Sequence, residues 1–268
     1  MRIGTQEFDT QNQTYIMGIL NVTPDSFSDG GRYDQLDAAL FHAEAMLQEG
    51  ASILDVGGES TRPGYAPVPA EEEIRRVVPV IRALTRRFKA PVSVDTWKSS
   101  VAEAAVQAGA SMINDIWGLK GDPKMARVAA ESGAACCLMH NRKEAVYEDF
   151  MREVAADLMA SVETAREAGV RDDRIILDPG VGFAKSYAQN LEVIARLEEL
   201  ACLGFPVLLG TSRKSVIGKT LDLPADQRLE GTLVTTVYAV QKGCAFVRVH
   251  DVKENLRAIQ MTKALMRG

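Results

Sequence analysis

The chain alternates short apolar runs with longer segments of helical periodicity. The apolar runs are almost continuously hydrophobic, which is typical of parallel strands that are covered on both faces. Eight such runs occur, at residues 15–20, 52–56, 91–95, 111–115, 135–140, 174–178, 206–210 and 245–249.

Each run is followed by a segment in which apolar residues recur with the period of a helix. These segments cover residues 36–50, 70–88, 101–110, 122–133, 149–169, 190–204, 228–243 and 252–266. Six of them end on or next to a glycine, the residue that a left-handed helix C-cap favours. The pattern predicts an α/β fold, a single-domain (β/α)8 TIM barrel over residues 1–268, with an irregular N-terminal lead over residues 1–13. An open doubly wound sheet is the alternative, because alternation alone does not show closure.

The segments after the first two predicted strands differ from the other connections. Residues 21–34 and 57–68 are rich in Gly, Pro, Ser and Asp, and both exceed the ~2–6 residues of an ordinary βα connection. Loops of this length on the active face of a barrel often act as mobile lids. We expect that role here, with a passive surface excursion as the alternative.

Composition and charge narrow the class of protein. The 268 residues are 46% hydrophobic and 25% charged, as in ordinary globular proteins. The net charge of −5 argues against binding nucleic acid or a membrane through a general positive field. The four cysteines lack the spacing of a disulfide framework or zinc site, and the N-terminal region lacks the apolar core of a signal peptide. We therefore expect a cytoplasmic protein.

Polar residues gather where the predicted strands end. In a barrel these ends share one face, which carries the active site. The residues are Asn21, Asp55, Asp95, Asn114 with Asp115, His140 with Asn141, Asp178, Ser212 with Arg213 and Lys214, and Arg248 with His250. Any one of the Asp or Asn residues could simply cap the next helix. Helix capping is a much weaker explanation for polar residues at the ends of all eight strands together.

These residues fall into two chemical groups. Asp95, Asn114 and Asp178 suit a flat heterocycle rich in N–H donors, and Met139 could supply an apolar wall, although core filler is its simpler role. The second group suits a phosphate or diphosphate and comprises Thr61, Arg62, Ser212, Arg213, Lys214, Arg248 and His250. Magnesium held loosely by Asn21 and substrate phosphates is compatible with both groups.

Seven segments resemble the successive signatures of the dihydropteroate synthase family, a group of pterin-binding barrels. They are MGILNVTPDSFSDGG, DVGGESTRPG, VSVDTWK, NDIWG, DPGVGFAKS, GTSRKS and RVHD, in the family's order over residues 17–251. The resemblance implies a (β/α)8 barrel that condenses 6-hydroxymethyl-7,8-dihydropterin diphosphate with p-aminobenzoate. The products would be 7,8-dihydropteroate and diphosphate, formed by an SN1-like displacement.

The resemblance also implies roles for particular residues. The pterin diphosphate would contact Thr61, Arg62, Asp95, Asn114, Met139, Asp178, Lys214, Arg248, Val249 and His250. The p-aminobenzoate would contact Phe27, Pro63, Phe183, Lys214 and Ser215. Lys214, Asp95, Arg248 and Asp25 would be the catalytic residues, and Asn21 would ligate Mg²⁺. A homodimer acting on small molecules, with no nucleic-acid or membrane partner, is expected from the same resemblance.

Two other functions would share part of this pattern. A methyltransferase that moves a methyl group from methyltetrahydrofolate to a corrinoid protein would need the pterin contacts but not the anion-binding residues of SRKS and RVH. A catalytically inactive pterin-binding paralogue would be expected to have degenerate loops, yet both long loops keep the signature residues. These features favour the synthase.

Overall fold

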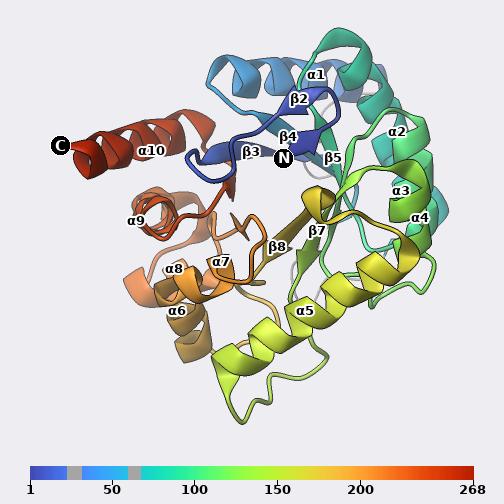
Figure 1. The fold of residues 1–268 in the computed structure, drawn as a ribbon. Helices are drawn as coiled ribbons and strands as arrows, with labels where there is room; N and C mark the ends of the chain where they lie inside the picture. Colours follow the sequence, from blue (N-terminus) through green and yellow to red (C-terminus); the bar gives the residue numbers. More distant parts are fainter. Residues whose placement is uncertain (23–31, 60–67) are drawn as a thin grey trace.

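A computed structural model describes residues 1–22, 32–59 and 68–268 of the chain. Its centre is a sheet of eight parallel strands in the order β8-β7-β6-β5-β4-β3-β10-β9, and the helices surround this sheet (Figure 1). The strands are β3 (Tyr15–Asn21), β4 (Ile53–Gly57), β5 (Val92–Asp95), β6 (Met112–Asp115), β7 (Ala135–Met139), β8 (Ile175–Asp178), β9 (Leu208–Leu209) and β10 (Phe246–Val249). All eight lie within the runs predicted from the sequence or within one residue of them.

The sheet closes on itself between its two edge strands. Leu177 of β8 forms a parallel bridge with Val207, directly before β9, and its amide donates a hydrogen bond to the Pro206 carbonyl over 2.9 Å. This contact confirms the predicted (β/α)8 barrel and excludes the open doubly wound sheet.

The helices follow the predicted pattern with two exceptions. They are α1 (Arg32–Gln48), α2 (Ala70–Arg87), α3 (Ser99–Gln107), α4 (Met125–Ser132), α5 (Phe150–Ala168), α6 (Tyr187–Ala195), α7 (Leu197–Ala201), α8 (Ser215–Leu221), α9 (Leu229–Gln241) and α10 (Val252–Arg267), with short 3-10 turns η2 (Asp172–Arg174) and η3 (Ala225–Gln227). The single helix predicted over 190–204 is divided at Arg196, whose φ of −112° and ψ of 27° leave the helical region. Helix α8 was not predicted, because seven residues are too few to display a period.

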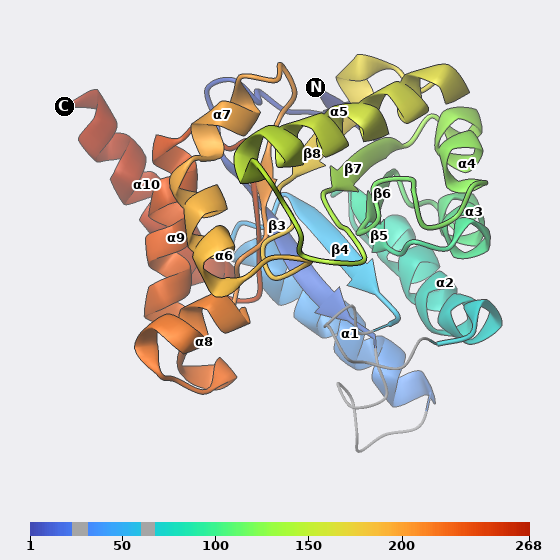
Figure 2. The same ribbon diagram turned by 90° about the horizontal axis from the view of Figure 1, so that it is seen from below.

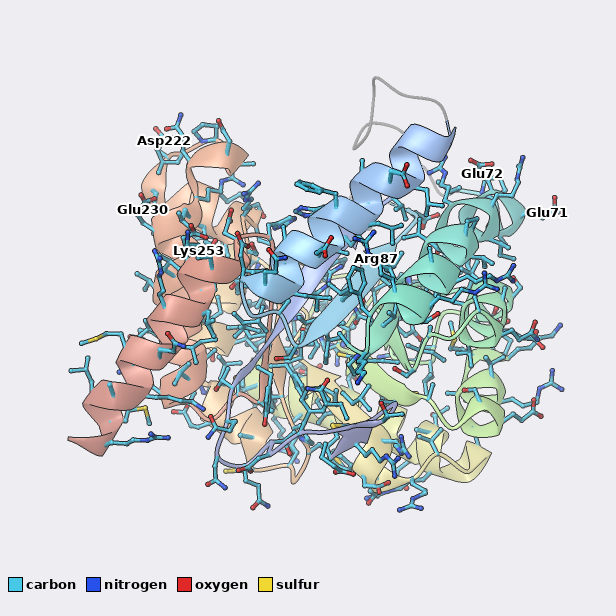
Figure 3. All side chains as sticks on the ribbon, turned by 90° about the horizontal axis from the view of Figure 1, so that it is seen from above. Glu71, Glu72, Arg87, Asp222, Glu230 and Lys253 are labelled. Carbon is cyan, nitrogen blue, oxygen red and sulfur yellow. The ribbon has the colours of Figure 1, made fainter. Side chains whose placement is uncertain are left out.

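Opposite charges stabilise the ends of α2 and its contact with α1. Figure 3 shows Glu71 and Glu72 at the N-terminal end of α2, with Arg87 in its last turn, which is the arrangement that complements a helix dipole. Arg87 also pairs with Glu44 of α1 over 2.7 Å. Within the described part of the chain, no helix is both long and apolar enough to span a bilayer.

Side chains inside the barrel form an apolar layer at the end where the strands begin. Met17, Ile53, Met112 and Phe246 belong to this buried cluster, and each is followed two residues later by a position that again faces inward. A larger apolar cluster lies between the barrel and the helices. Polar residues occupy interior positions towards the C-terminal ends of the strands, among them Asp55, Asp95, Asn114 and Arg248.

The N-terminal segment covers the apolar end of the barrel. Residues 1–13, expected to be irregular, contain an antiparallel hairpin formed by β1 (Arg2–Ile3) and β2 (Gln6–Glu7). Ile3 is fully buried with the interior cluster, and the ring of Phe8 lies edge-on to Tyr15 at 4.9 Å. In Figure 2 the arrowheads of β3 and β4 point away from this end of the molecule. The hairpin therefore leaves the polar end of the barrel as the place for a site.

Candidate active site

An arginine shared by two carboxylates lies in the polar layer of the barrel. Arg248 of β10 donates through Nε to Asp55 Oδ2 at 2.6 Å and through Nη2 to Asp95 Oδ2 at 2.7 Å. Asn114 of β6 donates through Nδ2 to the same oxygen of Asp55 at 3.2 Å. Four strands therefore contribute to one hydrogen-bonded cluster inside the barrel.

Strand register explains why these residues meet. Asp55 and Arg248 each follow an apolar interior residue by two positions, so their side chains enter the barrel one layer above it. The neighbouring strands align Asp55 with Ser93 and Asp95 with Asn114. The apolar residues between them, such as Val56 and Val94, face the helices instead.

Three polar atoms of this layer are buried without a hydrogen-bond partner among the residues that the structure describes. They are Asp55 Oδ1, Asp95 Oδ1 and Ser93 Oγ. A buried acceptor without a donor costs about 1–3 kcal/mol, and more when it is charged. Such a cost is reasonable at a binding site, where the donors belong to a ligand. The two carboxylate oxygens call for N–H groups.

A second cluster lies where β8 and β9 end. Asp178 Oδ1 accepts a hydrogen bond from the Gly180 amide at 2.7 Å. Lys214 Nζ donates to the Val181 carbonyl at 2.7 Å and lies 5.0 Å from the centre of the Phe183 ring. Lys214 Nζ and Asp178 Oδ2 are 3.7 and 3.8 Å from the point that a Cβ on Gly210 would occupy. Glycine at this position therefore keeps open a space bordered by an ammonium and a carboxylate.

Burial changes the acidity of several of these groups. It raises the pKa of Asp95 to about 7, although Arg248 opposes the change, and it raises the pKa of Asp178, although Lys214 opposes it. Burial also lowers the pKa of Lys214 to about 8, with Asp178 opposing. Perturbed acids and bases that meet in one place are typical of an active site.

The residues expected to bind an anion do not all point to one place. Ser212 Oγ lies 2.9 Å from His250 Nδ1 and also accepts a hydrogen bond from the His250 amide at 3.2 Å. Arg213 instead pairs with Asp251, through Nε at 3.1 Å and Nη2 at 2.5 Å. Its side chain is therefore paired on the rim, and an anion-binding role for Arg213 stays a prediction.

The remaining predicted site residues differ in their placement. Met139 ends β7, buried and in register with Asp178, where an apolar wall was expected. Val249 belongs to the apolar cluster between barrel and helices, so its side chain faces away from the barrel interior. Ser215 is the exposed first residue of α8. Five predicted residues lie outside the described part of the chain, namely Asp25, Phe27, Thr61, Arg62 and Pro63.

Sequence reasoning placed both Asp55 and Asp115 at strand ends without giving either a role in the site. Asp55 was treated as a strand end, although a charged residue followed by Val56 inside an apolar run could have indicated a buried functional position. Asp115 accepts hydrogen bonds from the amides of Trp117 and Leu119, both at 2.8 Å. It shapes the turn after β6 and does not cap the next helix, α4, which begins at Met125.

Comparisons with known proteins agree with this arrangement. Residues 17–250 match the family described as pterin binding enzyme. A dihydropteroate synthase from Clostridium beijerinckii is 56% identical over 268 residues, which is 100% of both chains. A dihydropteroate synthase from Clostridium difficile, crystallised in the presence of pteroic acid, superposes with a TM-score of 0.95 at 52% identity, covering 98% of this chain and 100% of that one.

A third comparison comes from Xanthomonas albilineans. Its dihydropteroate synthase with 4-aminobenzoic acid has a TM-score of 0.92 at 43% identity, covering 96% of this chain and 95% of that one. This chain therefore belongs to the family of pterin-binding enzymes. Within the family it groups with the dihydropteroate synthases, and it is a transferase.

The raised pKa of Asp95 predicts a pH-dependent stability difference in the ligand-free protein. The folded protein keeps a proton on Asp95 up to a pKa of about 7, whereas the unfolded chain releases it near the ordinary aspartate pKa of 3.8. Wild type should therefore lose stability across this window as the pH rises. The free energy of unfolding of Asp95→Asn, minus that of wild type, should increase from about pH 4 to about pH 7 and level off above it.

Urea denaturation at a series of pH values measures this difference. Asp226→Asn, at an exposed position, is the matched control and should give a difference that does not depend on pH. A pH-independent difference for Asp95→Asn as well would contradict the raised pKa.

Proposed function

We propose that this chain condenses 6-hydroxymethyl-7,8-dihydropterin diphosphate with p-aminobenzoate to give 7,8-dihydropteroate and diphosphate. The observation that carries the proposal is the pair of buried, unpartnered carboxylate oxygens on Asp55 and Asp95. The amino and ring N–H groups of a pterin match them in kind and number. Asp178 and Lys214, beside the space at Gly210, extend the same pocket and complete the contacts to the ring.

The carboxylates stabilise the charge that develops during the reaction. The bond between the pterin methylene carbon and the diphosphate oxygen breaks first, and the electron pair leaves with the diphosphate. Positive charge then spreads over the methylene and the ring, where Asp95 and Asp178 are oriented in advance. The neutral arylamine attacks through its nitrogen lone pair, and its proton is lost afterwards to water.

Cationic and hydroxyl groups next to these carboxylates are available for the leaving group. Arg248 uses Nε and Nη2 for Asp55 and Asp95, and its guanidinium carries further N–H donors for a phosphate oxygen. Ser212 and His250 lie at the ends of the neighbouring strands. Thr61 and Arg62 keep their proposed role at the diphosphate on the strength of the sequence alone.

The arylamine site is proposed next to Lys214. The ring of Phe183 lies under the Lys214 ammonium, and Ser215 follows it at the start of α8, which suits an aromatic ring bearing a carboxylate. Phe27 and Pro63, with Asp25 in the first loop, are assigned here by resemblance. Lys214 touches both proposed substrates and is the residue on which the reaction should depend most.

Removing the side chain of Lys214 should therefore abolish most of the activity. Lys214→Ala and Asp178→Ala are each expected to lower kcat/KM by about two orders of magnitude or more, because each removes a charge that the transition state uses. Formation of dihydropteroate from the two substrates with Mg²⁺ is the measurement. Lys219→Ala, at an exposed position of the same helix α8, should leave the rate unchanged.

The outcome also separates the alternatives. If the wild-type protein binds the pterin but makes no product, the inactive-paralogue interpretation replaces the synthase. If it instead transfers a methyl group from methyltetrahydrofolate to a corrinoid protein, the methyltransferase interpretation does.

The residues at the end of β3 fit a weakly held Mg²⁺. Asn21 Oδ1 and Asp95 Oδ2 lie 3.5 and 3.8 Å from the point that a Cβ on Gly57 would occupy, so two oxygen donors border one open space. Magnesium prefers few protein oxygens together with phosphate oxygens. Over the described ranges, no group of three or more His, Cys, Asp or Glu side chains forms a metal site of its own. Asn21 would hold the ion, which when bound would neutralise charge on the departing diphosphate.

Chelation tests this assignment. We expect EDTA to abolish product formation and added Mg²⁺ to restore it. Asn21→Ala should raise the Mg²⁺ concentration needed for half-maximal activity by roughly tenfold. Asn12→Ala, in the N-terminal segment before β3, should not change that concentration. Full activity of the wild type in excess EDTA would contradict a magnesium requirement.

A homodimer is proposed to form through the late helices. Val234 on α9 is 59% exposed, and Met261 and Leu265 on α10 are 59% and 70% exposed. The two helices lie next to each other at one side of the barrel (Figure 1). A molar mass of two chains in solution is expected, and a mass of one chain in Val234→Glu/Met261→Glu. A wild type that is monomeric at micromolar concentration would refute the dimer.

The proposed place of action is the cytoplasm. The thiols of Cys136, Cys137, Cys202 and Cys244 are all free, which fits a reducing compartment.

A further inference from the structure

A half-buried lysine outside the proposed substrate pocket makes two hydrogen bonds to the loop that borders the pocket and a third contact to a histidine that follows β7. Lys185 Nζ donates to the carbonyls of Gly180 and Phe183, both at 3.1 Å, and approaches His140 Nδ1 at 2.7 Å. An ammonium has three N–H donors. All three are therefore used, and nothing is left over for a ligand.

The approach of Lys185 fixes the tautomer of His140. Burial lowers the pKa of Lys185 to about 7. In its ammonium form Lys185 can only donate, so His140 Nδ1 then accepts and the ring proton sits on Nε2. That nitrogen lies 3.1 Å from Asp157 Oδ2, which can then accept a hydrogen bond from the Nε2–H group. His140 is fully buried, and burial together with Lys185 lowers its pKa to about 3, so the ring is neutral.

The outer end of this chain of hydrogen bonds is held by Arg142. Its Nε donates to Asp157 Oδ2 at 2.6 Å, and its Nη1 donates to Glu153 Oε2 at 2.8 Å. Asp157 and Glu153 belong to α5, and Arg142 lies on the loop after β7. The chain of contacts therefore ties Lys185 to a helix on the outside of the barrel.

The loop after β8 needs such support because its backbone is unusual. Gly180 has a φ of +69° and Ala184 a φ of +43°, and a left-handed conformation is costly for alanine. A Cβ on Gly180 would lie 2.0 Å from the His140 carbonyl oxygen, so the loop passes directly against the end of β7. Its Gly180 and Phe183 carbonyls turn towards Lys185.

The same loop carries two contacts to Lys214. The carbonyl of Val181 accepts from Lys214 Nζ at 2.7 Å, and the ring of Phe183 lies 5.0 Å from the same atom. The carbonyls held by Lys185 belong to Gly180 and Phe183, so they flank Val181 on both sides. Movement of this part of the backbone would displace the Lys214 ammonium and the aromatic wall together.

We propose that Lys185, oriented by the neutral ring of His140 and by Asp157, is a positioning residue that fixes the loop 180–185 and thereby sets the place of Lys214 and Phe183. This inference rests on the proposed function, in which Lys214 contacts both substrates. Lys185 itself touches neither substrate.

Lys185→Met removes the three donors and keeps the length of the side chain. We expect kcat/KM for p-aminobenzoate to fall about 100-fold, because small displacements in a site cost this much, with both a higher KM and a lower kcat. Lys143→Met is the matched control on the same face. Lys143 is exposed and makes no side-chain hydrogen bond or ion pair to a described residue, and the activity of Lys143→Met should equal that of wild type.

A second measurement distinguishes the proposed positioning role of Lys185 from a purely structural role in the fold. Inorganic diphosphate, titrated with Mg²⁺ by calorimetry, should bind Lys185→Met as tightly as wild type, because Arg248, Ser212 and His250 are held by other strands. General loss of the fold would weaken diphosphate binding as well. Asp157→Asn, at a partly exposed position, is the second variant if Lys185→Met fails to fold, and should show the same division with a fall of about tenfold.

Lys214→Ala, assayed in parallel, shows whether a negative result contradicts the proposed function or only the positioning role of Lys185. If Lys214→Ala is active, the proposed function of the pocket is wrong. If Lys214→Ala is inactive while Lys185→Met keeps the wild-type kcat and KM, only the positioning role is overturned. A crystal structure of Lys185→Met with the Val181 carbonyl and Lys214 in their wild-type places would overturn it too.

Discussion

The barrel depends on one buried ion cluster, in which Arg248 of β10 is shared by Asp55 of β4 and Asp95 of β5. Removing one partner of a buried ion pair is costly, because the remaining charge has no water to replace it. Here three strands that are distant in sequence supply the cluster. The three side chains can meet only when β10, β4 and β5 have their native register.

The cluster is arranged for binding rather than for stability alone. Two carboxylates around one arginine leave one oxygen on each without a donor, and a core optimised for folding would satisfy or replace them. Burial also raises the pKa of Asp95 to about 7, because the charged carboxylate is removed from water. The apolar layer beneath, sealed by Ile3 and Phe8 of the N-terminal segment, offsets this cost because it buries large side chains in the same barrel.

Most of the fold could be predicted from the sequence because its signals are local. A buried parallel strand must be apolar on both faces, and a helix beside it must be apolar on one, so the order of elements can be read directly. Closure was predicted, but alternation alone left the open sheet as an alternative, since the two folds differ in contacts such as the bridge between Leu177 and Val207. The division of α6 from α7 depends on the conformation of Arg196 alone, which has no signal at the scale of a helix.

The site divides in the same way. The sequence placed Asp95, Asn114, Asp178, Lys214 and Arg248 on one rim, because strand ends in a barrel share one face. It could not predict which side chains pair, since pairing is a tertiary property: Arg213 meets Asp251, and Asp55 meets Arg248 across the barrel. Val249 was included by resemblance, yet the alternation of side chains along β10 turns it to the helices.

The loop after β8 shows why supporting residues are harder to find than substrate contacts. Lys185 follows a glycine-rich stretch and looks like a surface lysine in the sequence, yet its ammonium meets two carbonyls and a histidine. Only an ammonium can satisfy three acceptors that converge from one backbone loop and one ring, since a neutral amine has two N–H groups. The left-handed backbone at Gly180 and Ala184 accompanies a loop whose Gly180 and Phe183 carbonyls face Lys185. The same loop brings Val181 and Phe183 to Lys214. The loop geometry that contacts Lys214 therefore also needs the cation of Lys185.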